Sequence, residues 1–336
     1  MRKMRQPKGI TDPGLLSALD QSRKILIIGH ISPDGDCVGS MLAVGMALEK
    51  KGKSVSFCLQ DPVPGRYRFL KDAERILPPE SFADAVFDLA LAVDCADEGR
   101  MGSAAPLFRA CPATAQIDHH ATNPLYASFN EVDGCASCAG CIVWRMMGEW
   151  GIKPDIPMAE CLYCAISTDT GRFCFSSTDE ETFLCAADIV SSGFDISRCA
   201  RNVHLVREVP FLKLLGAALS GMRFFAGGRC AAMWLDRADF TAAGASGEHA
   251  DGIINYALNI PGVGMAYMVN LCNPGEAKFS FRAVPPYHVN DIAALFGGGG
   301  HVLAGGFRTT EDPRRVADKV EAAMEAEMDA IGSGAE

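Results

Sequence analysis

Long apolar runs are missing from this sequence, although 49% of its residues are hydrophobic. No stretch approaches the roughly 18–20 consecutive apolar residues that a membrane-spanning helix needs. The basic start MRKMRQPKGI is followed by TDPGLLSALDQ, which is not the apolar core of a signal peptide. We therefore expect a protein that stays in the cytoplasm and makes no contact with a membrane.

An excess of positive charge is also lacking, since 31 Lys and Arg residues face 41 Asp and Glu residues, which gives a net charge of −10. Proteins that bind long nucleic acids gain affinity from a broad basic surface that displaces counterions from the phosphates. The composition thus argues against a long duplex as the partner. A small phosphorylated ligand remains compatible, because metal ions and a few basic groups can reverse the field locally.

Internal repeats and low-complexity segments are absent as well. At 336 residues the chain exceeds the size at which a single core stops growing, so we expect two domains. Apolar segments that read as strands alternate with helical segments, a pattern that predicts an α/β fold with a mostly parallel sheet and helices on both faces. These strands are expected at 24–30, 53–59, 88–94 and 114–118.

The second half of the chain has a different pattern. Residues 197–223 are helical in pattern and predict a helical connector between a first domain, 12–196, and a second, 224–331. Further strand-like runs at 230–236, 263–271 and 277–283 predict a smaller mixed α/β domain, closed by a helix from about Arg314 to Ala330.

Disulfides are not expected, because the 14 cysteines belong to a chain that we place inside the cell. Cys135, Cys138 and Cys141 have the C-x₂-C-x₂-C spacing of a bacterial ferredoxin, but the fourth Cys before a Pro is missing. Cys161 and Cys164 form a further C-x₂-C pair. Both runs lie in apolar segments that read as helices, where thiols spaced by three pack as small hydrophobic groups. A metal cluster or a structural zinc site is the alternative.

Four motifs carry most of the information on function: HISPDGDCVGS at 30–40, AVDCAD at 92–97, IDHHATN at 117–123 and STDTGRF at 167–173. Each lies where an apolar run ends, and open α/β sheets bind ligands at the carboxyl ends of their strands. Together the motifs supply imidazole and carboxylate groups at His30, Asp34, Asp36, Asp94, Asp118, His119, His120 and Asp169.

Imidazoles mixed with carboxylates suit a divalent ion such as Mn²⁺, Mg²⁺, Co²⁺ or Zn²⁺. One ion would have too many ligands, whereas two ions that share a bridging Asp would use most of them. Two ions roughly 3.5–4 Å apart can clamp the attacking and leaving oxygens of a phosphoryl displacement. The motifs therefore predict a two-metal phosphoesterase. Its nucleophile is expected to be a metal-bridging hydroxide, because no serine or cysteine in the motifs has a paired base.

The motif HxxPDxDxxGS, the isolated Asp94, the DHH triplet and the later DTG resemble the signature of the DHH phosphoesterases. The run GGGGH at 297–301, followed by AGGF, resembles the motif of the DHH-associated C-terminal domain. Members with only these two domains form the nanoRNase/pAp-phosphatase (NrnA-like) group. The resemblance implies that the first domain binds metal and is catalytic, and that the second holds the substrate.

The resemblance also implies individual roles for the metal-competent residues. His30 and Asp34 would hold one ion, Asp36, His119 and Asp169 the other, and Asp94 would bridge the two. Mn²⁺ is the expected ion, with Mg²⁺ or Co²⁺ as alternatives. Asp118 would orient a histidine or a metal-bound water rather than bind metal itself. His120 would face the scissile phosphate, and the alternative is a core imidazole bonded to backbone.

Substrate contacts are expected mainly in the second domain. Successive glycines allow backbone N–H groups to converge on a phosphate. Taken alone they also fit a flexible loop at the end of a helix; the resemblance, together with the helix before them and the AGGF after them, implies a phosphate loop at Gly298, Gly299, Gly300 and His301. Arg282 resembles a strand arginine of this domain that meets substrate phosphate or base, and the alternative is a solvent-facing side chain. In the first domain Asn123 is a candidate for phosphate contact, although an Asx turn before Pro124 explains it nearly as well.

The expected function is hydrolysis of phosphate esters in short oligonucleotides and in 3′-phosphoadenosine 5′-phosphate (pAp). The alternatives are a cyclic or linear dinucleotide phosphodiesterase, or a single-strand exonuclease of the same superfamily. The membrane-anchored members and the long-strand nucleases carry extra segments, which we expect to be absent here. A non-catalytic nucleotide-binding protein is disfavoured because every expected ligand position is filled. RNA and DNA cannot be ranked from the sequence, and the oligomeric state stays open, with a homodimer as one alternative.

Overall fold

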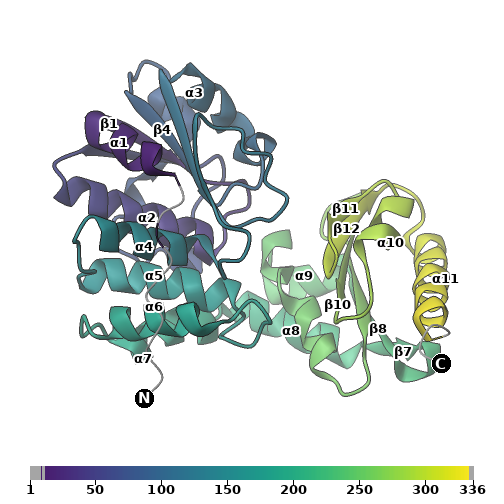
Figure 1. Ribbon diagram of the computed structural model, residues 1–336. Coiled ribbons are helices and arrows are strands. Elements are labelled where there is room, and N and C mark those ends of the chain that lie inside the picture. The colour runs from purple at the N-terminus through teal and green to yellow at the C-terminus, as the bar shows by residue number, and fades with distance from the viewer. Residues whose placement is uncertain (1–8, 10–11, 333–336) are drawn as a thin grey trace. The chain divides into compact units, whose positions relative to one another are not determined.

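The computed structural model describes Gly9 and residues 12–332, except for the side chain of His301. It divides into two compact units, one up to Val206 and one from Arg207 onwards. Each unit is built on a six-stranded sheet (Figure 1). No helix in the described part of the chain is both long and apolar enough to cross a membrane.

The first sheet has the strand order β3-β2-β1-β4-β5-β6, and all of its strand pairs are parallel. The prediction of a mostly parallel sheet is therefore confirmed. The two short edge strands β3 and β6 were not foreseen. The strands are β1 (Lys24–Ile28), β2 (Ser54–Cys58), β3 (Ile76–Leu77), β4 (Leu89–Val93), β5 (Ala113–Asp118) and β6 (Phe129–Val132).

Helices cover both faces of this sheet, as its buried strands require. Ile25 and Ile27 of β1 belong to one apolar cluster, whereas Leu26 and Ile28 belong to another on the opposite face. The helices α2, α4 and α5 pack on the first face and α3 on the second (Figure 1). The helices of this unit are α1 (Pro13–Gln21), α2 (Gly35–Lys50), α3 (Ala105–Ala110), α4 (Ala139–Glu149), α5 (Ile156–Asp169), α6 (Glu180–Val190) and α7 (Ile196–Ala200), with short turns η1 (Gly65–Tyr67), η2 (Ala73–Arg75), η3 (Pro79–Phe82), η4 (Glu98–Ala104) and the π-turn η5 (Arg201–Leu205).

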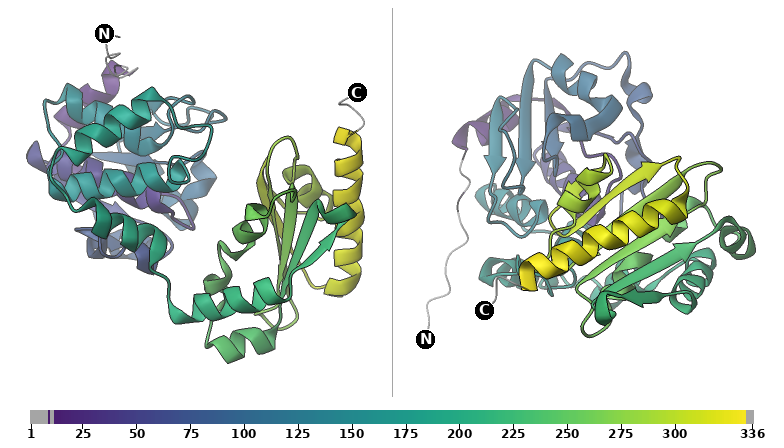
Figure 2. Two further views of the ribbon diagram at one scale, coloured as in Figure 1. Left: turned by 90° about the horizontal axis from the view of Figure 1, so that it is seen from below. Right: turned by 90° about the vertical axis from the view of Figure 1, so that its right-hand side faces the viewer.

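The second sheet is mixed, with the order β11-β12-β10-β9-β8-β7; β8 and β9 pair in parallel and the other neighbours antiparallel. The helix α11 lies across one face of the sheet (Figure 2), and α8 and α9 pack on the other. The elements are α8 (Val209–Ser220), β7 (Arg223–Phe225), η6 (Ala226–Gly228), β8 (Cys230–Leu235), α9 (Arg237–Ala243), η7 (Gly247–Ala250), η8 (Ile253–Asn259), β9 (Met265–Asn270), β10 (Ala277–Ala283), α10 (Asn290–Leu295), β11 (Gly299–His301), β12 (Ala304–Thr309) and α11 (Pro313–Gly332).

The segment 197–223, expected as a helical connector, is helical over most of its length but belongs to both units. Cys199 and Val203 are buried in the core of the first unit. Leu214 and Ala218 of α8 are buried in the core of the second. The chain passes from one unit to the other at Val206 and Arg207.

Candidate metal centre

The histidines and aspartates of the four motifs meet at the point where the strand order of the first sheet reverses. After β1 the chain enters α2 on one face, and after β4 it enters η4 and α3 on the other. Because β1, β4 and β5 are neighbours, His30, Asp94 and His119 follow directly from adjacent carboxyl ends. Such switch points are where open α/β sheets bind ligands.

Asp94 lies at the middle of the cluster and is buried. Its Oδ2 is 3.3 Å from Nε2 of His30, and its Oδ1 is 3.5 Å from Nε2 of His119. Oδ1 has no hydrogen-bond donor among the described residues, although it is fully enclosed. The backbone of Asp94 is also in the left-handed region, at φ +58°. Such a conformation is uncommon outside glycine and is often found at functional sites.

One group of donors lies on the β1 side of Asp94. His30 Nε2 is 3.7 Å from Oδ1 of Asp34, which caps the N-terminus of α2 by accepting hydrogen bonds from the backbone of Asp36 and Cys37. The thiol of Cys37 also comes within 4.8 Å of metal-competent atoms of His30 and Asp94. Sequence reasoning missed Cys37, because its place in the first turn of an apolar helix gave no sign that it would approach His30.

A second group lies on the other side, around His119. Its Nε2 is 3.8 Å from Oδ2 of Asp36 and 3.5 Å from Oδ2 of Asp169. Asp169 is the last residue of α5, and Asp36 is in the first turn of α2. Asp36 is held firmly, since it accepts hydrogen bonds from Ala139 N at 2.7 Å, Gly140 N at 3.0 Å and Ser40 Oγ at 2.8 Å.

The donor atoms fit the binding of divalent metal ions. Asp94 turns one oxygen towards His30 and the other towards His119. The enclosed Oδ1 of Asp94, which no described donor satisfies, makes this carboxylate a candidate metal ligand. Neutral imidazole and carboxylate donors suit ions such as Mn²⁺.

The carboxylates and histidines shift one another's pKa values strongly. Burial raises the pKa of Asp36 well above its usual range, and the charges of Asp94 and Asp169 add to this. Burial also raises the pKa of Asp169, to about 7, while His119 opposes the shift. Burial alone would lower the pKa of His119, but Asp94, Asp36 and Asp169 raise it above its usual value.

The pKa of Asp94 is lowered and that of His30 is raised, in each case by the oppositely charged neighbours and against the effect of burial. Burial would raise the pKa of Asp94, but His119 and His30 outweigh it and lower that pKa. Burial would lower the pKa of His30, but Cys37, Asp34 and Asp94 raise it. Metal ions that bind these groups would compete with protons on the histidines.

Asp118 lies beside this cluster rather than in it. It is fully buried, and its Oδ1 accepts a hydrogen bond from Nδ1 of His120 at 2.7 Å. Its Oδ2 accepts from Nδ2 of Asn123 at 2.6 Å. This geometry favours the expected role of Asp118 in orienting a histidine. Nδ1 of His120 is 3.9 Å from Oδ1 of Asp94, so the ring borders the cluster.

Asn123 was expected as a phosphate contact, but the structure engages both ends of its amide within the protein. Nδ2 donates to Asp118 and to the carbonyl of Cys95, while Oδ1 accepts from Leu125 N at 2.8 Å. The last contact is the Asx turn that Pro124 suggested. These contacts favour a positioning role, with Asn123 holding the carboxylate of Asp118.

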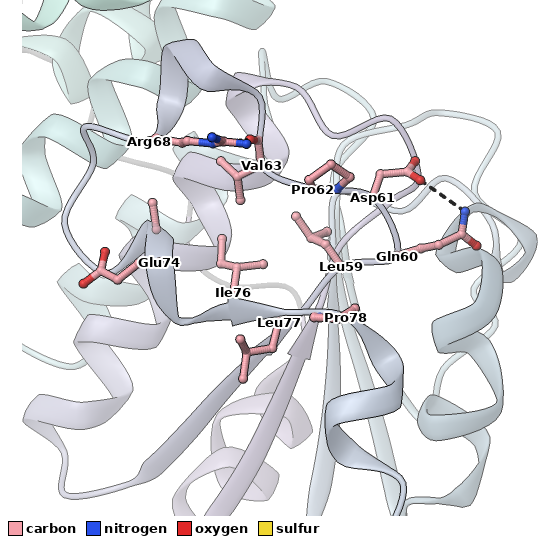
Figure 3. A pocket seen from close by; sticks show the side chains of 11 residues that line it. Leu59, Gln60, Asp61, Pro62, Val63, Arg68, Glu74, Ile76, Leu77 and Pro78 are labelled. Carbon is pink, nitrogen blue, oxygen red and sulfur yellow. Dashed lines mark hydrogen bonds between the residues drawn. The ribbon is translucent and has the colours of Figure 1, made fainter.

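A pocket beside β2 and β3 is tied through one of its lining residues to the loop between His30 and Asp34. Oδ2 of Asp61 accepts a hydrogen bond from Ser32 N at 2.6 Å. Asp61 and Gln60 stand at one end of this pocket of about 440 Å³, and Leu59, Ile76 and Leu77 line its middle (Figure 3). The loop after β2 thereby fixes the backbone between the two predicted ligands His30 and Asp34.

In the second unit, Arg282 of β10 lines a cavity of about 650 Å³ together with Lys278 and Arg308. Its Nη1 donates to its neighbour's carbonyl, Phe281 O, at 2.8 Å, and burial lowers the pKa of the guanidinium. Lys278 pairs with Asp251, which also lines the cavity, and Arg308 pairs with Glu276. Arg282 forms no ion pair among the described residues, and such a guanidinium suits an anionic ligand. The cavity lies entirely within the second unit.

The glycine run was expected as a phosphate loop, and this expectation about its conformation is wrong. Gly299, Gly300 and His301 form strand β11, which pairs antiparallel with β12. A Cβ on Gly298 would lie 2.2 Å from Gly306 O, and one on Gly300, at φ +144°, 2.3 Å from Ala304 O. These glycines therefore allow two strands to approach closely. The side chain of His301 lies outside the described residues, and of the run itself only Gly297 lines the cavity.

None of the 14 cysteines, all of which are described, forms a disulfide. Cys138, Cys141, Cys161 and Cys164 are buried, but Cys135 is exposed because α4 begins only at Ala139. Sγ of Cys138 lies 3.6 Å from Sγ of Cys141. The exposed position of Cys135 separates it from the other two thiols of the ferredoxin-like run.

The fold and this site define the chain as a member of the DHH family. Residues 24–166 match the DHH family, N-terminal domain. Within that family the chain is similar to the bifunctional oligoribonuclease and PAP phosphatase NrnA of Thermus thermophilus, with 30% identity over 284 residues, or 84% of this chain and 83% of that protein. The Bacillus subtilis NrnA is 26% identical over 291 residues, 84% of this chain and 88% of that protein. The resemblance read from the motifs is confirmed.

Solved structures agree on the fold. An exopolyphosphatase-related protein from Bacteroides fragilis superposes with a TM-score of 0.87 at 24% identity, covering 93% of this chain and 96% of that one. RecJ from Thermus thermophilus, solved in complex with Mn²⁺, superposes with a TM-score of 0.54 at 13% identity, covering 96% of this chain and 56% of that one. The two-domain α/β class predicted from the sequence is thereby confirmed.

Proposed function

We propose that the chain is a two-metal phosphoesterase that hydrolyses phosphate esters in short oligonucleotides and in pAp, with Mn²⁺ as its preferred ion. The relatives named oligoribonuclease and PAP phosphatase cover most of the chain and support this choice of substrates. The acidic net charge of −10 agrees with a small substrate rather than a long one.

The observation that carries the proposal is the position of Asp94. Its two oxygens face different histidines, at 3.3 Å from His30 Nε2 and 3.5 Å from His119 Nε2. A carboxylate that lies between two histidines and keeps a buried oxygen without a donor is suited to bridge two ions. We assign His30, Asp34 and Asp94 to one ion and Asp36, Asp94, His119 and Asp169 to the other.

When bound, two such ions supply positive charge to the phosphate and bring the pKa of water towards neutrality. The chain's own residues hold the ligand and substrate-facing side chains in place. Ala139 and Gly140 fix the carboxylate of Asp36, and Asp118 fixes the ring of His120, which we assign to the scissile phosphate. In the second unit we assign Arg282, which lines a cavity, to the binding of a phosphorylated ligand.

A chromatographic time course tests this function. Purified protein with Mn²⁺ is given a dinucleotide, a longer oligomer, a cyclic dinucleotide, pAp and pyrophosphate. We expect rapid turnover of the dinucleotide and pAp, slower turnover of the oligomer and none of pyrophosphate. Chelation should abolish the activity and Mn²⁺ should restore it. The same assay is run on Asp94→Asn, which should lose most of the activity. Asp84→Asn, an exposed change in the same unit, is its control and should keep the activity.

Two outcomes would contradict the proposal. Full activity after exhaustive chelation, with no residual metal by mass spectrometry, would end the two-metal assignment. Preferred hydrolysis of the cyclic dinucleotide would instead identify a cyclic-dinucleotide phosphodiesterase of the same superfamily.

A further inference from the structure

Arg100 reaches the metal cluster from the far side of the His30 ring. It lies in η4, where its backbone N–H donates to Oδ1 of Asp97 at 3.2 Å. Its carbonyl accepts a hydrogen bond from Ile31 N at 2.8 Å, which ties η4 to the loop that carries His30. The guanidinium Nη2 then lies 3.1 Å from Nδ1 of His30. The half-buried arginine is thus fixed at the edge of the cluster by its backbone on both sides.

The contact with His30 gives the guanidinium no acceptor. Nε2 of His30 faces Asp34 and Asp94, so it is the nitrogen that would bind metal. The ring proton then belongs to Nδ1, which is 2.8 Å from the carbonyl of Ile31 and donates to it. A guanidinium also only donates, so Nη2 and Nδ1 are two donors in contact.

No carboxylate compensates Arg100 either. Among the described residues its guanidinium forms no ion pair, although the cluster it borders holds Asp34, Asp36, Asp94 and Asp169. Arg109, on the same stretch of chain, does pair with an acid, Glu98. A half-buried cation without an acceptor, at the edge of a site for metal ions, is placed to receive an anion.

We propose that Arg100 binds an anionic oxygen of the substrate phosphate that occupies the two-metal site. The inference rests on the proposed phosphoesterase function. The planar fork of arginine matches two phosphate oxygens, and its charge-assisted hydrogen bonds are stronger than neutral ones. In the phosphate complex the guanidinium gives up its donor–donor contact with His30 for the phosphate oxygens. Arg100 then adds the permanent positive charge of its guanidinium to the positive charge that bound metal ions would supply.

The test is phosphate binding, measured separately from turnover. Inorganic phosphate and AMP are titrated calorimetrically into the Mn²⁺-loaded protein, with adenosine as a ligand that lacks phosphate. Arg100→Gln should weaken binding of phosphate and AMP by about one to two orders of magnitude, the range for one charge-assisted hydrogen bond. Adenosine binding and metal content should not change. Arg109→Gln removes the same charge from an exposed neighbouring position and should bind phosphate like the wild type.

Arg100→Lys tests whether the positive charge alone is enough or whether the planar guanidinium is needed. It also provides the test if Arg100→Gln does not fold. It keeps a cation without the fork, so its affinity for phosphate should fall between the other two proteins. Wild-type affinity for phosphate in folded Arg100→Gln, or in Arg100→Lys where only that variant folds, would overturn the proposal. Loss of a metal ion from either variant would also overturn it, because Arg100 would then act by supporting His30. A wild-type protein that binds phosphate but hydrolyses neither the dinucleotide nor pAp would refute the proposed function alone.

Discussion

Gly39 of α2 packs directly on the carbonyl of Cys161 in α5: a Cβ at position 39 would lie 2.3 Å from that oxygen. The two helices carry Asp36 near the start of α2 and Asp169 at the end of α5. Their close approach therefore helps to bring both carboxylates to His119. The close packing of α2 on α5, and with it the position of Asp36 and Asp169 beside His119, therefore depends on the absence of a Cβ at Gly39.

Gly39→Ala should destabilise the protein and weaken the group around His119. The alanine gains about 1 kcal/mol of helix propensity, but overpacking against a backbone oxygen costs about 1–3 kcal/mol. We expect a net loss of up to about 2 kcal/mol in the free energy of unfolding, measured by urea denaturation. Gly148→Ala in α4 is the control, because its Cβ would meet nothing within 4 Å. A Gly39→Ala protein as stable as Gly148→Ala would mean that α2 and α5 separate at little cost.

Asp94→Asn should be the most damaging single change among the ligands. The amide keeps the shape of the side chain but offers less charge to both ions, so both should be lost or weakened. We expect kcat/KM to fall by more than the roughly 10–100-fold that is typical of residues that only support a ligand. The metal content of Asp94→Asn, measured by mass spectrometry, should fall below that of Asp34→Asn, because we assign Asp34 to only one ion. Greater damage from Asp36→Asn or Asp169→Asn would assign the bridge to another residue.

Metal uptake should release protons and should weaken as the pH falls. Asp169 has a pKa raised to about 7, and that of His119 is also raised. Ions bind the carboxylate and the neutral imidazole, so protons compete increasingly as the pH drops through 7. Calorimetric titration of Mn²⁺ at pH 6, 7 and 8, in buffers of different ionisation enthalpy, measures both effects. Asp169→Asn should bind the second ion more weakly but with a flatter pH dependence. Equal proton release by wild type and variant would contradict the role of Asp169.

The sequence predicted that these histidines and aspartates come together because each lies at or near one end of a regular element. His30, Asp94 and His119 come after apolar strands, and parallel strands end at one edge of a sheet. Arg100 gave no such signal, since its contact with His30 arises only from how η4 folds back on the loop after β1. Cys37 was hidden for a similar reason, within an apolar helix.

The glycine run failed as a prediction for a different physical reason. Glycine has a low strand propensity and no side chain to show alternation, so a glycine strand cannot be recognised by its pattern. Only the close approach of Gly298 and Gly300 to the backbone of β12 explains the conformation. The edge strand β6 was missed because Phe129–Val132 is short and polar at its centre.

Arg282→Gln should impair handling of substrate while both ions stay bound. Arg282 lines the cavity of the second unit with Lys278 and Arg308, far along the chain from any predicted metal ligand. Losing one charge-assisted contact costs about 1.5–3 kcal/mol, or roughly one to two orders of magnitude in kcat/KM. The control is Arg229→Gln, an exposed change in the same unit outside the cavity lining. Steady-state kinetics on a dinucleotide and on pAp, with metal analysis of each protein, make the measurement. Wild-type kinetics for Arg282→Gln would show that this cavity does not receive the substrate, and loss of metal would place Arg282 in the support of the metal centre instead.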